Sequence, residues 1–272
     1  MTDFFRLIFD PYSRQARLYP ALLTLLPPIS IILAFWPNLL APTSVKVVVG
    51  FATAFGLLYL LASFARSRGK RVEKRLLAAW EAWPTTIWLR HRGGFLKEPT
   101  LARYHEYLTK NVPGLKMPTQ ADELADAAKA DIQYASAVEW LKEQCRGKAH
   151  ALVEKENTEY GFRRNLRGMR PTGVCLCVVG TFAATLAMLA QADSGMLTQP
   201  AHLWFMNAKS PISAAIILNI VVTGAWLVFV NDSWVREGAD QYARALLANC
   251  ESVGGTKPTR RARKPAVPTG TP

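Results

Sequence analysis

Charged side chains are absent from four long stretches of this 272-residue sequence. The stretches are residues 18–45, 47–65, 171–192 and 210–231. A charged group at the centre of a bilayer costs about 2.5–3.5 kcal/mol on insertion scales, so uncharged runs of about 19 residues or more are typical of membrane spans. The sequence therefore predicts an integral membrane protein whose spans come as two pairs.

Cysteine is scarce, and the motifs of enzymes and metal sites are missing. The four cysteines show neither a CxxC nor a Cys/His ligand spacing, which argues against a disulfide or a zinc site. The four histidines are not spaced as metal ligands, and no HExxH, GxSxG or Walker motif occurs. We therefore expect no catalytic residue, no metal and no cofactor. The uncharged spans also argue against a proton-coupled or ion-coupled transporter.

Basic residues are abundant but unevenly distributed. The formal net charge is +13, and 31 of the 33 lysines and arginines lie in residues 1–17, 66–170 and 232–272. The positive-inside rule places these three segments, and thus both termini, on the cytoplasmic side of the inner (plasma) membrane. Contact with anionic headgroups accounts for most of this charge, so we expect the lipid bilayer rather than nucleic acid as the partner. The first uncharged run lacks a convincing cleavage site and is read as a signal anchor.

Helical periodicity dominates the segment between the two pairs of spans, and no β-type alternation occurs. One amphipathic stripe recurs every 3.5 residues on average. Its members are Leu124, Ala128, Ile132, Ala135, Val138, Leu141 and Cys145. The second uncharged run continues without a breaker from Phe51 to Trp83 apart from Gly69, which predicts one helix that leaves the bilayer as a stalk.

The predicted fold is all-α, with four transmembrane helices as two hairpins that flank a cytoplasmic helical-bundle domain. In chain order the expected parts are a cytoplasmic interfacial lead-in (1–17), a first transmembrane hairpin (18–65), a cytoplasmic α-helical domain (66–170), a second transmembrane hairpin (171–231), a cytoplasmic helix (232–252) and a disordered basic tail (253–272).

Prolines and small residues mark expected irregularities and contacts in the spans. Pro27 and Pro28 each remove a backbone donor, so we expect a kink or a break in the first span. Residues 2–16 predict either an interfacial helix broken by Pro11 or simply an ordered lead-in. Small residues at helix-packing spacing predict close contacts in the other spans. The residues assigned to helix packing or to a pore are Gly50, Ala54, Gly56, Gly180, Ala184, Asn219 and Thr223. Asn219 has two interpretations, a helix–helix contact or the lining of a polar path.

A first candidate site lies in the segment 84–92. Thr85 and Thr86 stand at a predicted helix start, whose free N–H groups favour an anion, and Arg90 and His91 follow about a turn later. This arrangement suits a phosphate or a nucleotide. The alternative is a capped short helix whose basic face meets lipid headgroups.

A second candidate site lies before the third span. Its arginines suit bidentate contact with phosphate. The alternative is anchoring at the membrane edge together with ion pairs within the domain, such as Glu159 with Arg163 at helical spacing. The candidate contacts are Tyr160, Arg163, Arg164, Asn165 and Arg167.

A third cluster is acidic. Asp122, Glu123, Asp126 and Asp131 lie near a predicted helix amino terminus, where carboxylates stabilise the helix dipole. Thr119 and Asp122 also have the spacing of a capping box. We interpret this cluster as structural.

Two short blocks, WPTTIWLRHR (83–92) and EN..YGFRRN (156–165), together with the flanking hairpins, resemble uncharacterised bacterial four-span membrane proteins. More loosely, they resemble the small multi-span effectors of anti-phage signalling systems, in which a cytoplasmic part senses a trigger and the spans damage the inner membrane. The resemblance implies a pore-forming or membrane-perturbing effector with a nucleotide or protein trigger. Because four uncharged spans cannot line a conducting path alone, such an effector would be a homo-oligomer. The alternative is a non-conducting scaffold or regulator that recruits a cytoplasmic partner.

Overall fold

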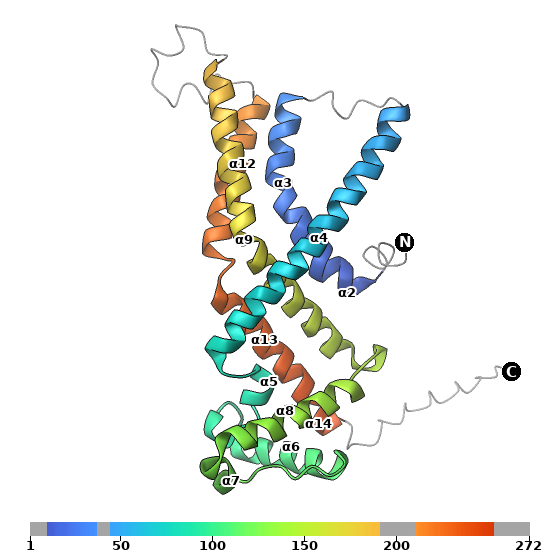
Figure 1. Ribbon diagram of the computed structural model, residues 1–272, viewed down its shortest axis with the longest axis vertical. Coiled ribbons are helices and arrows are strands. Elements are labelled where there is room, and N and C mark those ends of the chain that lie inside the picture. The colour runs from blue at the N-terminus through green and yellow to red at the C-terminus, as the bar shows by residue number, and fades with distance from the viewer. Residues whose placement is uncertain (1–9, 37–43, 191–209, 253–272) are drawn as a thin grey trace, which may run out of the picture. The chain divides into compact units, whose positions relative to one another are not determined.

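The computed structural model describes residues 10–36, 44–190 and 210–252, and these residues form helices and no β-strand (Figure 1). This confirms the predicted all-α class. The chain divides into two compact units, which we describe separately. Unit 1 comprises Met1–Pro84 and Arg146–Ala243, and unit 2 comprises Thr85–Cys145 and Arg244–Pro272. The predicted basic tail, residues 253–272, lies outside the described residues, as do residues 37–43 and 191–209 within the two predicted hairpins.

Unit 1 contains the long helices. They are α2 (Pro11–Ser13), the π-helix η1 (Arg14–Leu18), α3 (Tyr19–Phe35), α4 (Ser44–Trp80), η4 (Lys148–His150), α9 (Ala151–Ala190), α12 (Ser210–Val228) and most of α13 (Asp232–Leu247). Among the described residues, three helical stretches are long and apolar enough to cross a membrane: Pro11–Phe35, Ala151–Ala190 and Pro211–Val228. The remaining predicted span, residues 47–65, lies within α4. The side chains of residues 44–55, and with them the predicted packing positions Gly50 and Ala54, lie outside the described residues.

The amino-terminal segment is helical from Pro11 onward, and residues 1–9, on the other side of the predicted break, lie outside the described residues. Proline fits the first turn of a helix because its missing N–H has no partner there. The carboxylate of Asp10 caps this turn and accepts a hydrogen bond of 2.9 Å from the Ser13 N–H. The chain then passes through the π-helix directly into α3. The segment packs on α9, where Gly161 leaves room for the Tyr12 ring.

Pro27 and Pro28 do not break α3, which continues as one helix from Tyr19 to Phe35. Polar side chains gather at this point. Ser30 donates to the Pro27 carbonyl at 2.7 Å, and the Asn219 amide on α12 donates to the same carbonyl at 3.3 Å. The structure thus places Asn219, which is fully buried, in a helix–helix contact.

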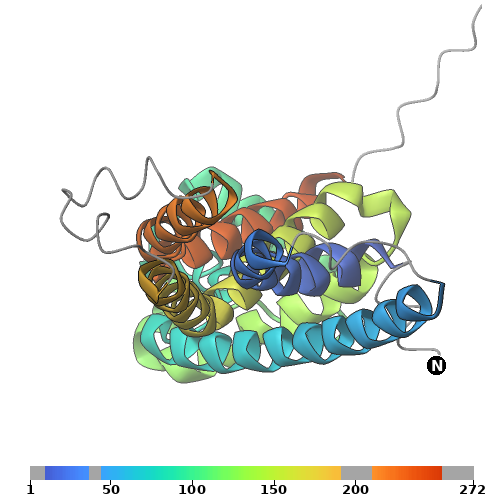
Figure 2. The same ribbon diagram turned by 90° about the horizontal axis from the view of Figure 1, so that it is seen from above.

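The helices α3, α9 and α12 run side by side, and α4 passes obliquely along one side of them (Figures 1 and 2). A buried apolar cluster joins the three helices and contains Ala184 together with Ile31 and Ile216. Gly180 faces Asn219 and Ile31, and Thr223 donates to the Asn219 carbonyl at 2.7 Å. The predicted packing residues of α9 and α12 therefore serve contacts within the chain.

The contact between α4 and α9 depends on two glycines. A Cβ atom added at Gly168 would lie 2.6 Å from the backbone of Arg68 and Gly69, and one added at Gly69 would lie 2.9 Å from the Asn165 Cα. Real Cβ atoms do not approach backbone so closely. The two helices therefore cross with their backbones in contact, and only glycine fits on either side.

Unit 2 contains shorter helices. They are α5 (Pro84–Ile87), the 3₁₀-helix η3 (His91–Gly93), α6 (Glu98–Asn111), α7 (Gln120–Ala125), α8 (Ala127–Gln144) and α14 (Asn249–Ser252). Thr119 and Asp122 form the predicted capping box at the start of α7. The core of unit 2 includes the fully buried side chains of Leu89, Leu108, Tyr134 and Leu141.

The amphipathic stripe predicted for residues 124–145 is only partly correct. Leu124 and Ile132 are 81% and 71% exposed, whereas Ala130 and Tyr134 are buried. The reason is a helix break at Asp126, whose non-helical backbone (φ −149°) ends α7 and whose side chain caps α8. A period of about 3.5 residues counted from Leu124 across this break assigns the first residues of α8 to the buried face, although they lie on the exposed face.

We expect Gly168→Ala to lower the free energy of unfolding by about 1–3 kcal/mol, because overpacking a tight contact costs this much. Gly224→Ala on α12 is the matched control, since a Cβ there meets no atom within 4 Å. The control should be neutral or stabilising by up to about 1 kcal/mol through helix propensity. Thermal unfolding of the purified protein in detergent, followed by circular dichroism, measures both. Equal transition temperatures for the two variants would contradict the backbone contact.

Candidate anion-binding site

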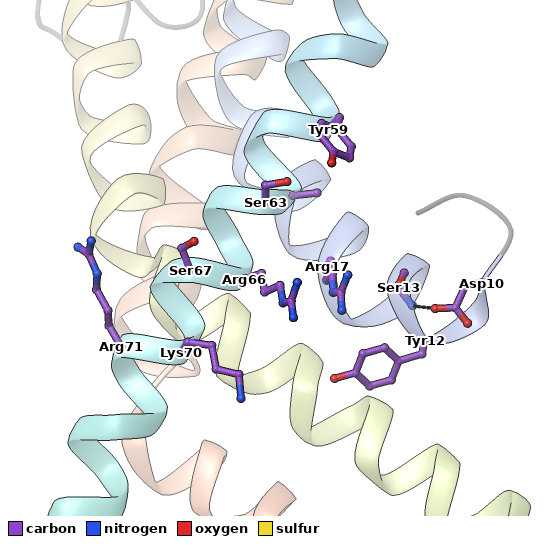
Figure 3. A pocket seen from close by; sticks show the side chains of 11 residues that line it. Asp10, Tyr12, Ser13, Arg17, Tyr59, Ser63, Arg66, Ser67, Lys70 and Arg71 are labelled. Carbon is purple, nitrogen blue, oxygen red and sulfur yellow. Dashed lines mark hydrogen bonds between the residues drawn. The ribbon is translucent and has the colours of Figure 1, made fainter. Parts of the chain in front are cut away.

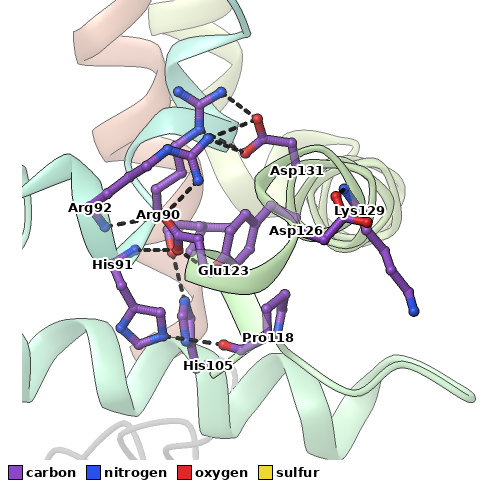
Figure 4. Close-up of polar contacts among 11 residues, drawn as sticks. Arg90, His91, Arg92, His105, Pro118, Glu123, Asp126, Lys129 and Asp131 are labelled. Carbon is purple, nitrogen blue, oxygen red and sulfur yellow. Dashed lines mark hydrogen bonds and ion pairs between the residues drawn. The ribbon is translucent and has the colours of Figure 1, made fainter. Parts of the chain in front are cut away.

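The first predicted cluster lies in unit 2, where its cations bind carboxylates of the same unit (Figure 4). The buried Arg90 guanidinium donates two hydrogen bonds to Asp131, at 2.8 and 2.7 Å. Arg92 donates to Asp131 and, at 2.6 Å, to Glu123. A phosphate at this position would therefore have to displace a carboxylate that already matches the guanidinium fork.

Glu123 is the centre of this network. Its side chain is 2% exposed and accepts hydrogen bonds from the backbone N–H groups of His91 (2.8 Å) and Arg92 (3.2 Å) and from the Tyr134 hydroxyl (2.7 Å). Burial alone would raise the pKa of Glu123, but these hydrogen bonds lower it below its usual value. The network folds the segment around residues 90–92 against α7 and α8.

The threonines and histidines of this cluster are also enclosed. Thr85 and Thr86 are buried, and the Thr85 hydroxyl has no hydrogen-bond partner among the described residues. The His91 and His105 rings meet edge to face with centroids 4.9 Å apart, and the His105 Nε2 lies 2.8 Å from the Leu89 carbonyl oxygen. Burial lowers the pKa of His105 below its usual value.

The acidic cluster has two roles. Asp122 and Asp126 cap α7 and α8, as their interpretation as structural residues predicts. Glu123 and Asp131 instead hold the arginines of the preceding segment.

The second predicted cluster lies on α9 in unit 1, and its arginines are paired as well. Arg164 forms an ion pair with Glu73 on α4, and both side chains are 8% exposed. Arg163 binds Glu159 at 3.0 Å, which confirms the predicted pair at helical spacing. Arg167 binds Asp232 on α13 at 2.8 Å.

The remaining members of the second cluster tie α9 to its neighbours. The Tyr160 hydroxyl donates to Glu73 at 3.2 Å, and the Asn165 amide donates to the Ala16 carbonyl of the π-helix at 2.7 Å. Lys70 also donates to Glu73, at 2.6 Å. Burial alone would raise the pKa of Glu73, but Arg164 and Lys70 lower it below its usual value.

A third site, not predicted as such, is a cavity of about 900 Å³ in unit 1 between α2, η1 and α4 (Figure 3). We call it the basic cavity. Figure 3 shows the guanidinium groups of Arg66 and Arg17 directed toward one another from α4 and η1, with the Tyr12 ring beside them. The lining residues are Asp10, Tyr12, Ser13, Arg17, Tyr59, Ala62, Ser63, Arg66, Ser67, Lys70 and Arg71.

The described residues do not balance the positive charge of the basic cavity. Arg17, Arg66 and Arg71 make no ion pair with a carboxylate anywhere in the part of the chain that the structure describes. Of the described residues in the lining, Asp10 alone is acidic, and its carboxylate caps α2. Guanidinium groups that face one another without a counterion repel, so this cavity favours an anion.

The residues on the α4 side of the cavity form a helical pattern in the sequence, from which no site was predicted. Tyr59, Ser63, Arg66, Ser67 and Lys70 follow the spacing i, i+4, i+7, i+8 and i+11, which places them on one face of the helix. The sequence analysis assigns the basic residues among them only to the cytoplasmic segment 66–170 and to contact with lipid headgroups. Their partners on η1 are distant in sequence and become visible only in the folded chain.

No family model, no curated protein and no solved structure matches this chain. The resemblance to uncharacterised bacterial four-span membrane proteins, and the looser one to multi-span effectors of anti-phage systems, stay predictions. Among the described residues, no group of three or more His, Cys, Asp or Glu side chains is placed to hold a metal ion.

Acidification should destabilise unit 2. The pKa values of His105 and Glu123 are lowered on folding, so the unfolded chain binds more protons than the folded one. Stability should fall as the pH drops through the ordinary histidine pKa of about 6.5, and again below the ordinary glutamate pKa of about 4.3. Transition temperatures measured from pH 7.5 to pH 4 test this. His105→Gln should flatten the first part of the curve, and an unchanged curve would contradict the assignment.

Glu123→Gln should lower the free energy of unfolding by about 3 kcal/mol at pH 7, because Arg92 loses its charged partner and buried donors are left unsatisfied. Glu106→Gln, on the exposed side of α6, removes the same charge and serves as the control. Its effect should stay within about 0.5 kcal/mol. Denaturant unfolding of both variants at pH 7 measures the difference.

Glu73→Gln should lower the unfolding free energy by about 3–5 kcal/mol, because the Arg164 guanidinium would remain buried without its carboxylate. Glu237→Gln removes a partner of Arg163 whose side chain is 62% exposed, and this control should cost less than about 1 kcal/mol. If the two variants unfold at the same temperature in detergent, the Glu73–Arg164 pair does not hold α4 on α9.

Proposed function

We propose that this protein is an inner-membrane protein with four spans and cytoplasmic termini that senses a phosphate-bearing anion in the basic cavity. The three apolar helices, the uncharged run within α4 and the one-sided distribution of basic residues support the topology. The observation that carries the function is the set of arginines in the basic cavity that form no ion pair with a carboxylate of the described residues.

Phosphate is the anion that this lining suits best. A guanidinium presents its N–H groups as a planar fork that matches two phosphate oxygens. Arg17 and Arg66 approach from opposite walls, and the hydroxyls of Tyr12, Ser63 and Ser67 supply further donors. The volume of the cavity is that of a site for a small ligand. Both predicted phosphate clusters lack this property, since their arginines already bind carboxylates.

A route for the response begins at Lys70, which lines the cavity and also binds Glu73. Glu73 in turn holds Arg164 next to the glycine contact between α4 and α9. An anion that attracts Lys70 weakens its hold on Glu73 and changes the balance of this buried network. The ligand thereby acts on the contact between two long helices.

What the spans do in response has two candidate answers. The first is a non-conducting regulator that presents its cytoplasmic helices to a partner, and the internal use of Gly180, Ala184 and Asn219 favours it. The second is an oligomeric effector that perturbs the membrane. Gly56 and Gly224 favour it, because a Cβ atom added at either residue would meet no described atom within 4 Å. A second copy of the chain therefore has room to pack against these positions. Ion flux from liposomes with and without pyrophosphate separates the two candidates, because only an effector releases ions.

Pyrophosphate should bind the purified full chain in detergent, as measured by isothermal titration calorimetry, with an affinity that falls as salt is raised. Arg17→Gln and Arg66→Gln should each weaken binding by tenfold or more, about 1.4 kcal/mol, because each removes a charge-assisted contact. Arg75→Gln is the control, since this exposed arginine of the same helix pairs with Asp232 outside the cavity. The absence of binding, or equal affinities for the three variants, would contradict the proposal.

A further inference from the structure

We infer that the occupant of the basic cavity is an anionic phospholipid, with its phosphate between Arg17 and Arg66 and an acyl chain along α4 beside Gly56. This inference rests on the proposed function, because it names the ligand of the same cavity.

The first argument is the order of the lining along α4. Tyr59, Ala62 and Ser63 belong to the uncharged run 47–65, whereas the cations begin directly after it at Arg66. The cavity is therefore neutral toward the membrane side of α4 and basic toward the other side. A phospholipid has the same polarity, with its phosphate at the boundary between the acyl chains and water.

The second argument is the open face of α4 above the cavity. Gly56 lies three residues before Tyr59 and seven before Ser63, hence on the same face of the helix. A Cβ added at Gly56 would meet no atom within 4 Å, whereas one added at Gly180 would meet Asn219 and Ile31 at 3.5 Å. The described residues therefore leave the space next to Gly56 open.

The third argument is how α3 and α4 meet. Leu18 and Ala21 pack against Ala62 in a buried apolar cluster at the level of the cavity. Figure 1 shows α3 and α4 diverging toward the carboxyl end of α3 and the amino end of α4. An acyl chain that enters from the membrane thus reaches the basic cavity along Gly56 and Tyr59. A soluble phosphate compound would leave this apolar approach unused.

The experiment compares two probes that share one phosphomonoester headgroup. Dioleoyl phosphatidate carries acyl chains, and glycerol 3-phosphate does not. Binding of each to the purified full chain in detergent micelles is measured by native mass spectrometry, with phosphatidylcholine as the reference lipid. We expect phosphatidate to bind at least tenfold more tightly than phosphatidylcholine and glycerol 3-phosphate, and Arg66→Gln to remove this preference.

Two leucine variants separate the acyl-chain contact from the headgroup contact. Gly56→Leu fills the space beside the chain and should weaken phosphatidate binding several-fold without changing the affinity for pyrophosphate. Gly224→Leu places the same side chain on an equally open glycine of α12 and should change neither. Circular dichroism confirms that both variants are folded, and the Arg66→Gln result does not depend on either of them.

The outcomes distinguish the inference from the proposed function. If pyrophosphate binds and Arg66→Gln weakens it, but phosphatidate binds no more tightly than phosphatidylcholine, the lipid inference is overturned and the proposed function stands. The same holds if Gly56→Leu and Gly224→Leu behave alike toward phosphatidate. If the unaltered protein binds neither phosphatidate nor pyrophosphate, both fail.

Discussion

The contact between α4 and α9 is the constraint on which the rest of unit 1 depends. Gly69 and Gly168 let the two backbones touch, and this close approach brings Glu73 within reach of Arg164. Asn165, on the same stretch of α9, then reaches the carbonyl of Ala16 and fixes the π-helix. The basic cavity lies between that π-helix and α4, so both of its walls are positioned from one crossing.

The arginines of this protein fall into two groups that differ in what neutralises them. Arg90, Arg92, Arg163, Arg164 and Arg167 bind carboxylates of the chain. A buried ion pair adds little stability by itself, yet it is costly to break, and it therefore fixes the geometry of the contact in which it lies. Arg17 and Arg66 form no such ion pair within the part of the chain that the structure describes. Counting basic residues in the sequence does not separate these groups, whereas locating the carboxylates does.

The sequence predicted the features that depend on local composition and period. The absence of β-type alternation predicted the all-α class, and the spacing of Thr119 and Asp122 predicted a capping box that the structure confirms. The long continuation of the second uncharged run is confirmed as well, although α4 ends at Trp80, directly before Glu81 with its left-handed φ of 68°. These features need no information beyond a few neighbouring residues.

The features that the sequence did not predict depend on tertiary contacts or on a local break within a helical segment. Arg90 finds Asp131 41 residues away, and Arg164 finds Glu73 91 residues away, so a phosphate site predicted from local basic residues could not account for them. The stripe that began at Leu124 failed because a helix break at Asp126 shifted its phase. The basic cavity was missed because its walls come from η1 and α4, which only tertiary packing brings together.

The π-helix at Arg14–Leu18 gives the cavity wall an unusual dependence on chain length. A π-helical turn holds an extra residue relative to an α-helical one, so everything that precedes it is offset by that residue. Losing one residue there would restore α-helical register and rotate the preceding turn by about 100° around the helix axis. Tyr12 would leave its place beside Gly161, while the register of α3 would not change. The identity of this wall is thus set by a residue count as much as by residue type, and single-residue insertions or deletions at this point can alter the ligand site without altering the span.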